Sequence, residues 1–327
     1  MTNQKKIIIS KTPLRISFIG GGSDLKSYFS HTGYGQVIST SIDKYIYITV
    51  HKRYDDLIRA SYSKTETVEN LKDMNHELIR ESLNYMGVSK GVEITSISDL
   101  TAHGTGLGSS SAYTIGVLNA LSNFKNKKYS KFNLANDASF IEIDVCGNPI
   151  GYQDQFACSF GGMNEIKFTE KSIDVTPVNI KTNDLDSLSK NLLLFDTGIK
   201  RKSSSVLSKQ KENYKNKKLK NTEELVKLLP EFKNCLTSGY ISDVGKLLHE
   251  SWLIKKCIVD GISNQCIDEM YETALMSGAT GGKLCGAGGG GFLLLYVEDS
   301  EKESVRRGLT GLRELQFDFD YEGATIL

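Results

Sequence analysis

Three clusters of glycine constrain this chain more than any other feature of its sequence. The chain of 327 residues holds 30 glycines, and many of them lie in the segments 20–22, 104–108 and 281–291. Glycine loses more backbone entropy on folding than any other residue, so a run of glycines is costly to order. We therefore expect each cluster where the backbone turns tightly or where another backbone or a ligand comes very close.

The composition excludes several classes of protein. At about 150 residues per domain, the length predicts about two domains. With 40 Lys and Arg against 39 Asp and Glu, the net charge is +1. A balance this even gives no overall field that attracts nucleic acid or an anionic membrane, so we expect neither as a partner.

The sequence also indicates the compartment. It shows no apolar run long enough to span a bilayer and no segment typical of a secretion signal. The cysteines form no C-x-x-C pair and no zinc-ligand set; they are Cys146, Cys158, Cys235, Cys257, Cys266 and Cys285. We expect a cytoplasmic protein whose thiols are reduced and mostly buried.

Strands and helices are predicted in separate groups. Strands are expected within 7–10, 15–19, 37–42, 45–51, 91–97, 167–180, 191–195 and 292–297. Helices are expected over 66–86, 112–121, 134–145, 203–220, 222–238, 241–252 and 264–277. This segregation predicts an α+β fold. Residues 147–165 are expected to be irregular and 183–190 weakly structured, which predicts domains 1–188 and 189–327.

The second glycine cluster follows a predicted strand and opens a helix. Accessible backbone N–H groups and a helix N-terminus favour an anion such as phosphate. The cluster lacks the Gly-Lys-Ser/Thr of a Walker A loop, and Ser109 stands where a dinucleotide fingerprint has its third glycine. A serine-capped helix after a flexible loop is the plainer alternative, but capping needs one serine rather than three.

The other two clusters carry different signals. The run 281–291 matches G-x-G-x-x-G, but a strand follows it, which excludes a Rossmann site. Beside the first cluster, Arg15 lies in an apolar strand and needs a carboxylate or phosphate partner, since an unpaired buried charge is costly. A structural ion pair is the alternative. Asp24 either caps the next helix or hydrogen-bonds a sugar hydroxyl.

The residues alone do not decide the role of two further segments. Glu142 lies near the end of a predicted helix, and Asp154 begins the element after a Gly/Pro turn. Taken alone, Asp154 is more often a helix N-cap than a base. The lysine-rich stretch 209–220 is either a solvated helix face or a basic flap that reaches a phosphorylated substrate.

Together and in this order, these segments resemble the GHMP kinase superfamily, which includes galactokinase, homoserine kinase and mevalonate kinase. Its three motifs resemble residues 13–24, 106–112 and 283–291. The resemblance implies a two-domain GHMP kinase fold with the active site in the cleft between the domains. It also implies a kinase that transfers phosphate from ATP directly to a small molecule, with no phospho-enzyme.

The resemblance assigns roles residue by residue. The ATP phosphates would be held by Gly104, Thr105, Gly106, Leu107, Gly108, Ser109, Ser110 and Ser111. Ser110 and Glu142 would bind Mg²⁺, and Asp154 would take the proton of the acceptor hydroxyl. Arg15 would favour the charged form of Asp154 and stabilise charge on the γ-phosphoryl group. Substrate would be contacted by Gly20, Gly21, Gly22, Ser23, Asp24, Tyr152, Lys200, Arg201, Lys202, Gly286, Ala287 and Gly288.

Residues 196–204, Trp252, Lys255 and 278–284 resemble one branch, the bacterial D-glycero-D-manno-heptose 7-phosphate kinases and the related fucokinase domains. This implies phosphorylation of the anomeric hydroxyl to the 1,7-bisphosphate, toward GDP-heptose for capsule or lipopolysaccharide. A phosphorylated sugar needs a second anion site, for which the basic residues 200–202 are suitable; a solvated basic turn is the alternative. A monomer or homodimer is expected.

Other functions remain open. A fucokinase or another GHMP sugar kinase would use the same residues. A diphosphomevalonate-decarboxylase-like lyase is possible because the superfamily contains such enzymes. A non-catalytic sugar or nucleotide sensor is the third alternative, although the expected base, metal ligands and Arg15 are all present.

Overall fold

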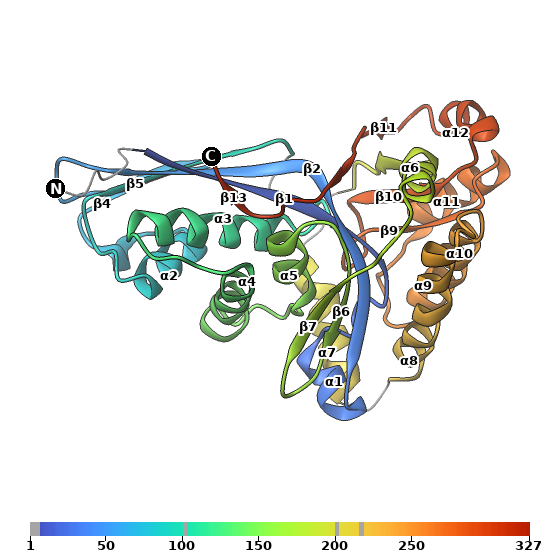
Figure 1. The fold of residues 1–327 in the computed structure, drawn as a ribbon, viewed down its shortest axis with the longest axis horizontal. Coiled ribbons are helices and arrows are strands. Elements are labelled where there is room, and N and C mark those ends of the chain that lie inside the picture. Colours follow the sequence, from blue (N-terminus) through green and yellow to red (C-terminus); the bar gives the residue numbers. More distant parts are fainter. Residues whose placement is uncertain (1–6, 101–103, 200–202, 216–218) are drawn as a thin grey trace.

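The computed structural model describes residues 7–100, 104–199, 203–215 and 219–327. Its strands and helices are segregated along the chain, which confirms the predicted α+β class. The elements gather around a long, bent sheet and a smaller sheet beside it (Figure 1).

Two long strands form the spine of the larger sheet. β1 (Ile7–Ile19) and β2 (Gly35–Lys52) pair antiparallel along most of their length, with Arg15 opposite Ser41. One half of β2 pairs with β5, and the other half pairs with β6. The remaining early strands extend these two wings: β3 (Ile58–Ser61), β4 (Thr65–Val68), β5 (Val92–Ser98), β6 (Met163–Phe168) and β7 (Ile173–Pro177).

Helices cover one face of this sheet. α3 (Ser109–Phe124) is apolar around most of its circumference and packs against both β1 and β2. At Gly116 the approach is so close that a Cβ would lie 2.9 Å from the Ile48 side chain. On the same side Figure 1 shows α2 (Glu77–Tyr85), α4 (Lys131–Ser139) and α5 (Gln153–Phe160). The larger sheet and α3 thus enclose the first part of the core.

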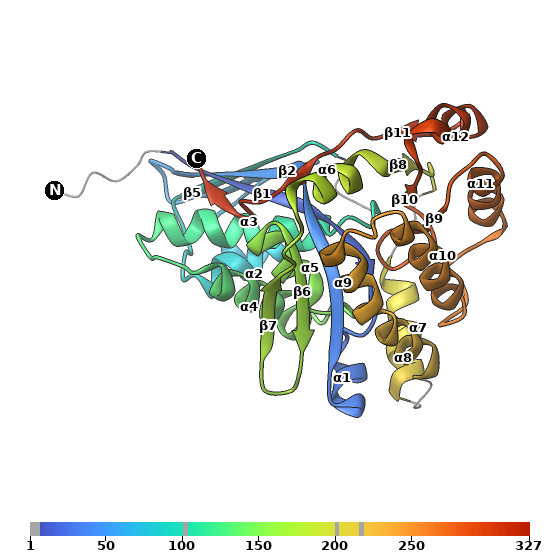
Figure 2. The same cartoon turned by 45° about the vertical axis from the view of Figure 1, so that its right-hand side comes forward.

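The smaller sheet belongs to the second half of the chain. Its strand order is β11 (Arg313–Glu314), β8 (Leu192–Asp196), β10 (Phe292–Tyr296) and β9 (Gly281–Leu284). Helix α10 (Asp243–Lys256) packs against β9 (Figure 2). The other helices here are α6 (Thr182–Asn191), α7 (Ser203–Lys215), α8 (Lys220–Lys227), α9 (Leu229–Ser238), α11 (Gln265–Met276) and α12 (Lys302–Gly308).

The end of the chain returns to the larger sheet. β12 (Phe319–Asp320) pairs with β2, and β13 (Thr325–Ile326) pairs with β1. The division into domains 1–188 and 189–327 stays a prediction; the last strands lie with the sheet that the first residues build.

Three expectations about local structure are wrong. The helix expected over 66–86 begins only at Glu77, because the alternating segment 65–68 pairs with β3 as β4. The stretch 183–190 is not weakly structured but forms α6, whose Leu188 is buried. Within 147–165, the segment expected to be irregular contains α5.

The burial of the cysteines agrees only partly with the expectation of mostly buried thiols. All six thiols are free, but Cys158, Cys235 and Cys285 alone are buried, while Cys257 and Cys266 are exposed. Over the described ranges, no helix is both long and apolar enough to cross a bilayer.

The contact between α10 and β9 yields a stability prediction. A Cβ at Gly281 would lie 2.0 Å from the Gly245 carbonyl oxygen, so Gly281→Ala must push α10 away from the sheet. We expect a loss of about 1–3 kcal/mol in the free energy of unfolding, measured by urea denaturation. Gly311→Ala is the control, because nothing lies within 4 Å of its Cβ position. Equal stabilities for the two variants would contradict this packing.

Candidate active site

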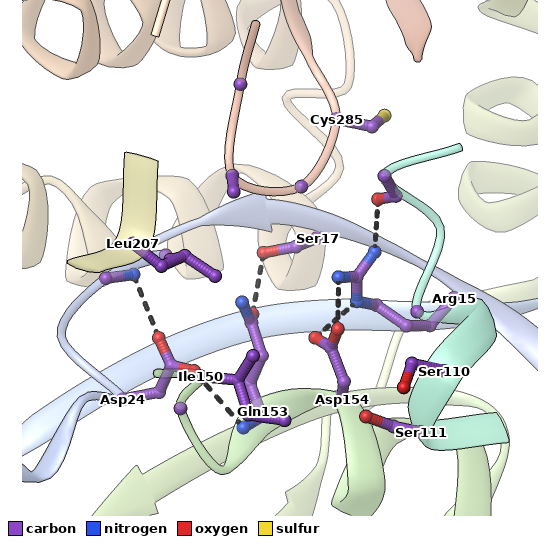
Figure 3. A pocket seen from close by; sticks show the side chains of 18 of the residues that line it. Arg15, Ser17, Asp24, Ser110, Ser111, Ile150, Gln153, Asp154, Leu207 and Cys285 are labelled. Atoms are coloured by element: carbon purple, nitrogen blue, oxygen red, sulfur yellow. Dashed lines mark hydrogen bonds and ion pairs between the residues drawn. The ribbon is translucent and has the colours of Figure 1, made fainter. Parts of the chain in front are cut away.

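A cavity of about 580 Å³ lies where the three glycine clusters meet. Its wall includes Gly21 and Gly22 from the first cluster, Gly104–Ser111 apart from Leu107 from the second, and Gly286, Ala287, Gly288 and Gly290 from the third. Figure 3 shows Asp24, Gln153 and Asp154 side by side on one wall, with Leu207 and Cys285 contributed by other elements. Segments far apart in the sequence thus form one site.

The glycines of the second and third clusters are in direct contact. A Cβ at Gly106 would lie 2.5 Å from the Cys285 carbonyl oxygen, and one at Gly286 would lie 2.6 Å from the Gly106 Cα. Gly286 also has a positive φ of 67°, which favours glycine. The predicted close approach of another backbone is therefore what this structure shows.

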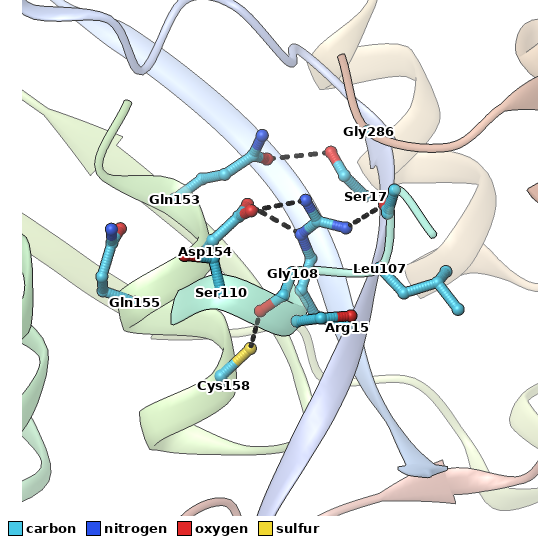
Figure 4. A network of polar contacts seen from close by, with 12 residues as sticks. Arg15, Ser17, Leu107, Gly108, Ser110, Gln153, Asp154, Gln155, Cys158 and Gly286 are labelled. Atoms are coloured by element: carbon cyan, nitrogen blue, oxygen red, sulfur yellow. Dashed lines mark hydrogen bonds and ion pairs between the residues drawn. The ribbon is translucent and has the colours of Figure 1, made fainter. Parts of the chain in front are cut away.

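An ion pair lies at the centre of the cavity wall. The Arg15 guanidinium donates to both carboxylate oxygens of Asp154, at 2.8 and 2.7 Å, and to the Gly106 carbonyl at 2.6 Å (Figure 4). Arg15 is 2% exposed, whereas the Asp154 side chain keeps 25% of its surface exposed. The bidentate contact fixes the direction of the Asp154 carboxylate. Asp154 lies in the first turn of α5 but makes no side-chain cap, so the N-cap alternative is wrong.

The glycine loop leads directly into α3. The helix begins at Ser109, and its N-cap residue is Gly108, with a φ of 77° and no side-chain cap. Thr105 instead shares a hydrogen bond with Ser109 at 2.8 Å and accepts one from the Leu107 N–H, which fixes the loop. The first N–H groups of α3, which face the cavity, remain available to an anion such as phosphate.

Glu142 lies directly behind this helix start. It belongs to a π-helical turn, η2 (Phe140–Val145), which continues α4. Its two carboxylate oxygens accept hydrogen bonds from the Ser110 hydroxyl and from the Gln155 amide, each at 2.7 Å. Complete burial raises the pKa of Glu142 to about 7, against the opposing effect of the hydrogen bonds. A buried carboxyl that is this costly to ionise suits a site that a cation neutralises.

A more polar part of the cavity lies around Asp24. Asp24 accepts hydrogen bonds from the N–H groups of Gly22, at 2.9 Å, and Gln153, at 3.3 Å. The alternative in which Asp24 caps the next helix is wrong, because the N-cap of α1 (Lys26–Thr32) is Leu25. Ser17 donates to the Gln153 side chain at 2.9 Å. Leu207 and Gln210 of α7 complete this side.

Several residues singled out from the sequence lie away from the cavity wall. Ser23 is buried and exchanges hydrogen bonds with the Gln36 backbone. Gly20 packs against the Gln36 carbonyl, Leu107 is fully buried, and Tyr152 packs against Phe29. Their structural role is to shape the two loops. Lys200, Arg201 and Lys202 lie outside the described residues.

The lysine-rich stretch shows a helix with two faces. Within α7, Val206, Gln210 and Tyr214 are buried at spacings of four residues, whereas Lys209 is exposed. Leu207 and Gln210 reach the cavity, and no lysine of this stretch is among the described lining residues. Up to residue 215, the described part of the stretch therefore supports the solvated-face alternative.

No sequence motif assigned a site role to Lys255 or to the other wall residues, which are Ser17, Leu25, Ile150, Gly151, Gln153, Leu207, Gln210 and Cys285. Most are ordinary polar or apolar residues within strands and helices, so only the fold brings them to the site. Lys255, at the end of α10, is buried in the structure, and a buried lysine usually has a specific partner.

Comparison with known proteins gives two family matches. Residues 71–162 match the model described as GHMP kinases N terminal domain, and residues 227–311 match GHMP kinases C terminal. A D-glycero-alpha-D-manno-heptose 7-phosphate kinase of Campylobacter jejuni is 29% identical over 97% of both chains. A galactokinase of Thermococcus kodakarensis is 27% identical over 92% of both chains. An Arabidopsis thaliana bifunctional fucokinase/GDP-fucose pyrophosphorylase is 26% identical, but the match spans 30% of that longer protein.

Solved structures share the fold. A D-glycero-D-manno-heptose 1-phosphate kinase from Bacteroides thetaiotaomicron superposes with a TM-score of 0.81 at 24% identity, over 98% of both chains. A Lactococcus lactis galactokinase in complex with galactose superposes with a TM-score of 0.76 at 18% identity, over 99% of this chain and 95% of that one. At these identities the likeness shows the fold alone.

The burial of Asp24 predicts a dependence of stability on pH. Burial, with Asp154 nearby, raises its pKa from 3.8 to about 6. Between these values the folded state holds a proton that the unfolded state has lost, so this group makes stability fall as pH rises from about 4 to 6. Asp24→Asn should therefore gain up to about 3 kcal/mol relative to the wild type between pH 4 and pH 7.

Urea denaturation of both proteins at the two pH values measures this difference. Asp186→Asn, at an exposed position on α6, is the control and should show no such change. The same pH profile for Asp24→Asn and the wild type would contradict the assignment.

Proposed function

The chain belongs to the GHMP kinases, which are ATP-dependent phosphotransferases, and from this premise we propose that its substrate is D-glycero-D-manno-heptose 7-phosphate. The phosphoryl group would pass to the anomeric hydroxyl and give the 1,7-bisphosphate. The observation that carries the proposal is the Asp154 carboxylate, fixed by Arg15 between the glycine loop and the polar part of the cavity.

The reaction needs a nucleophile that is held in line with a phosphoryl group whose charge is neutralised. Asp154 can accept a hydrogen bond from the acceptor hydroxyl, which orients the oxygen for attack. Because phosphoryl transfer has a loose transition state, the proton moves late, and a carboxylate that is held in position is a sufficient base. Arg15, 2.7 Å from Asp154, adds positive charge beside the transferred group.

The residues near the helix start fit a magnesium ion. Ser110 lines the cavity, and Glu142 lies fully buried behind it with 2.7 Å between their oxygens, so the two would offer hard oxygen ligands beside the proposed ATP loop. Mg²⁺ is usually held by one or two carboxylates together with substrate phosphates and water. Among the described residues no cluster of three acidic, His or Cys ligands exists, which agrees with an ion that arrives with ATP. When bound, the ion would neutralise charge on the phosphates.

The choice of a phosphorylated heptose rests on two kinds of support. The Campylobacter jejuni heptose 7-phosphate kinase aligns over 97% of both chains at 29% identity. The sequence has three consecutive basic residues at 200–202, and such residues are suitable donors to an anion. The Bacteroides thetaiotaomicron protein with the same fold is a heptose 1-phosphate kinase, so the position of the phosphate that the acceptor already carries is the point that most needs a test. The enzyme would act in the cytoplasm. Its product would be a step toward GDP-heptose, which is used for surface polysaccharide.

An unphosphorylated sugar is the second candidate. In the described part of the cavity, the groups around Asp24 are Ser17, Gln153 and Gln210, which suit sugar hydroxyls. The alignment with a fucokinase domain over 90% of this chain supports the same reading.

An ADP-release assay with Mg²⁺ and ATP tests these alternatives. The acceptors are D-glycero-D-manno-heptose 7-phosphate, the unphosphorylated heptose, L-fucose, galactose and phosphomevalonate. We expect turnover of the heptose 7-phosphate far above the others. Preference for an unphosphorylated sugar would overturn the proposed acceptor but keep the kinase activity. Carbon dioxide release from diphosphomevalonate, assayed separately with Mg²⁺ and ATP, would indicate a decarboxylase.

Loss of the proposed base gives the next prediction. Asp154→Asn keeps the shape of the side chain but removes its charge, so kcat should fall by about 1,000-fold, while ADP still binds. Asp144→Asn, at an exposed position on η2, is the matched control and should keep full activity. Wild-type turnover in Asp154→Asn would refute the role of Asp154.

A separate prediction concerns the acceptor phosphate. If Arg201 binds it, Arg201→Ala should raise KM for the phosphorylated sugar by about 10-fold and leave KM for ATP nearly unchanged, since a hydrogen bond to a charged group is worth about 1.5–3 kcal/mol. Lys209→Ala, at an exposed position on α7, serves as the control. Equal effects on both substrates would contradict a specific contact with the sugar phosphate.

A further inference from the structure

Two lysines are buried beside the cavity, and only one of them faces it. Lys283 is 3% exposed and donates to the backbone carbonyls of Ser17 and Phe18, at 2.8 and 2.7 Å. It joins β9 to β1 and does not line the cavity. Lys255, at the end of α10, is 7% exposed and does line the cavity. Its ammonium group is therefore available to a bound molecule.

The contacts of Lys255 leave its charge without a counter-ion. It donates to the Gly286 carbonyl at 2.6 Å and, more weakly, to the Leu284 carbonyl at 3.4 Å. No carboxylate of a described residue lies within ion-pair distance of it. A lysine ammonium has three N–H donors, and the described residues offer these two acceptors. A buried cation in this condition is costly unless an anion joins it.

The contacts of Lys255 indicate where in the cavity such an anion would bind. Gly286, whose carbonyl Lys255 contacts, packs directly against Gly106. The Gly106 carbonyl in turn accepts a hydrogen bond from Arg15 at 2.6 Å. Arg15 and Lys255 therefore each donate to one of the two glycines at the contact between the loops.

The other charged residues of the cavity also favour an anion beside Lys255. Arg15 is already paired with Asp154, and Asp24 and Glu142 are acidic. Burial lowers the pKa of Lys255 to about 8, and a neighbouring anion would favour the charged form further. Of the described cavity residues, Lys255 is thus the cation left to compensate a substrate phosphate.

We propose that Lys255 contacts the γ-phosphoryl group of ATP and stabilises its charge during transfer, opposite Arg15. This role rests on the proposed kinase function but not on the identity of the sugar. The oxygens of the γ-phosphoryl group gain no proton from Lys255. The ammonium group acts by charge and hydrogen bonding while the bond to the leaving β-phosphate oxygen breaks and the bond to the acceptor oxygen forms.

The test compares two neighbouring lysines on one helix. Lys255→Met keeps the side-chain length and removes the charge. Lys256→Met is the matched control, because Lys256 pairs with Asp268 at 3.0 Å and does not line the cavity. Affinities for ADP and for the non-hydrolysable analogue AMP-PNP are measured by calorimetry with Mg²⁺, and kcat is measured with whichever acceptor of the panel the wild type uses.

We expect Lys255→Met to lower kcat by about 100-fold or more, the range for loss of one electrostatic donor. Its affinity for AMP-PNP should fall about 10-fold, whereas its affinity for ADP and its KM for the acceptor change less than about threefold, because only the γ-phosphoryl contact is lost. Lys256→Met should match the wild type. An unchanged kcat, or equal losses of ADP and AMP-PNP affinity, would overturn the proposal; equal losses would mean that Lys255 only supports the loop.

A second measurement uses the wild-type protein and covers the case in which Lys255→Met does not fold. Acetylation of Lys255 by a small amine reagent is followed by mass spectrometry. AMP-PNP with Mg²⁺ should slow it more than about fivefold beyond the effect of ADP, since contact with an anion keeps the amine protonated and covered. Equal protection by the two nucleotides would overturn the proposal. Absence of any nucleotide binding to the wild type would instead overturn the proposed kinase function.

Discussion

The buried ion pair between Arg15 and Asp154 is the interaction on which the rest of the site depends. Arg15 lies in the middle of β1, under the helices that cover the larger sheet, and a charge at 2% exposure requires a partner. Its hydrogen bonds join the strand to α5 through Asp154 and to the glycine loop through the Gly106 carbonyl. One side chain thus fixes the distance between Asp154 and the loop that precedes α3.

The site also depends on the glycine loops having no side chains. The second and third clusters meet backbone to backbone at Gly106, Cys285 and Gly286, so no methyl group would fit between them. This contact brings the smaller sheet and α10 against the larger sheet, and with them Lys255. In the proposed site the glycines would therefore have two functions, because they would expose N–H groups to the ATP phosphates and they let the two loops meet.

The sequence predicted the parts of this account that depend on local chemistry. The α+β class followed from the separation of strands and helices, and the cavity lies where the glycine clusters predicted a ligand. Arg15 was recognised because a charge in an apolar strand needs a partner. The sequence could not show that this partner is Asp154, since 139 positions separate the two residues. Nor could it show that Asp24 contacts Gln153 rather than capping α1, or that Gln210 and Lys255 reach the cavity, because these depend on packing between distant elements. The helix expected over 66–86 failed for the same reason, as pairing with β3 overrides the helical spacing.

A crystal structure of the protein with Mg²⁺, AMP-PNP and D-glycero-D-manno-heptose 7-phosphate would show whether Asp154 faces the reacting hydroxyl. We expect the γ-phosphorus between Arg15 and Lys255, with the anomeric oxygen about 3–3.5 Å from it and within hydrogen-bond distance of Asp154. The Arg15–Asp154 pair should remain intact. A nucleotide seated away from the loop of residues 104–111, or an acceptor whose anomeric oxygen points away from Asp154, would contradict the account.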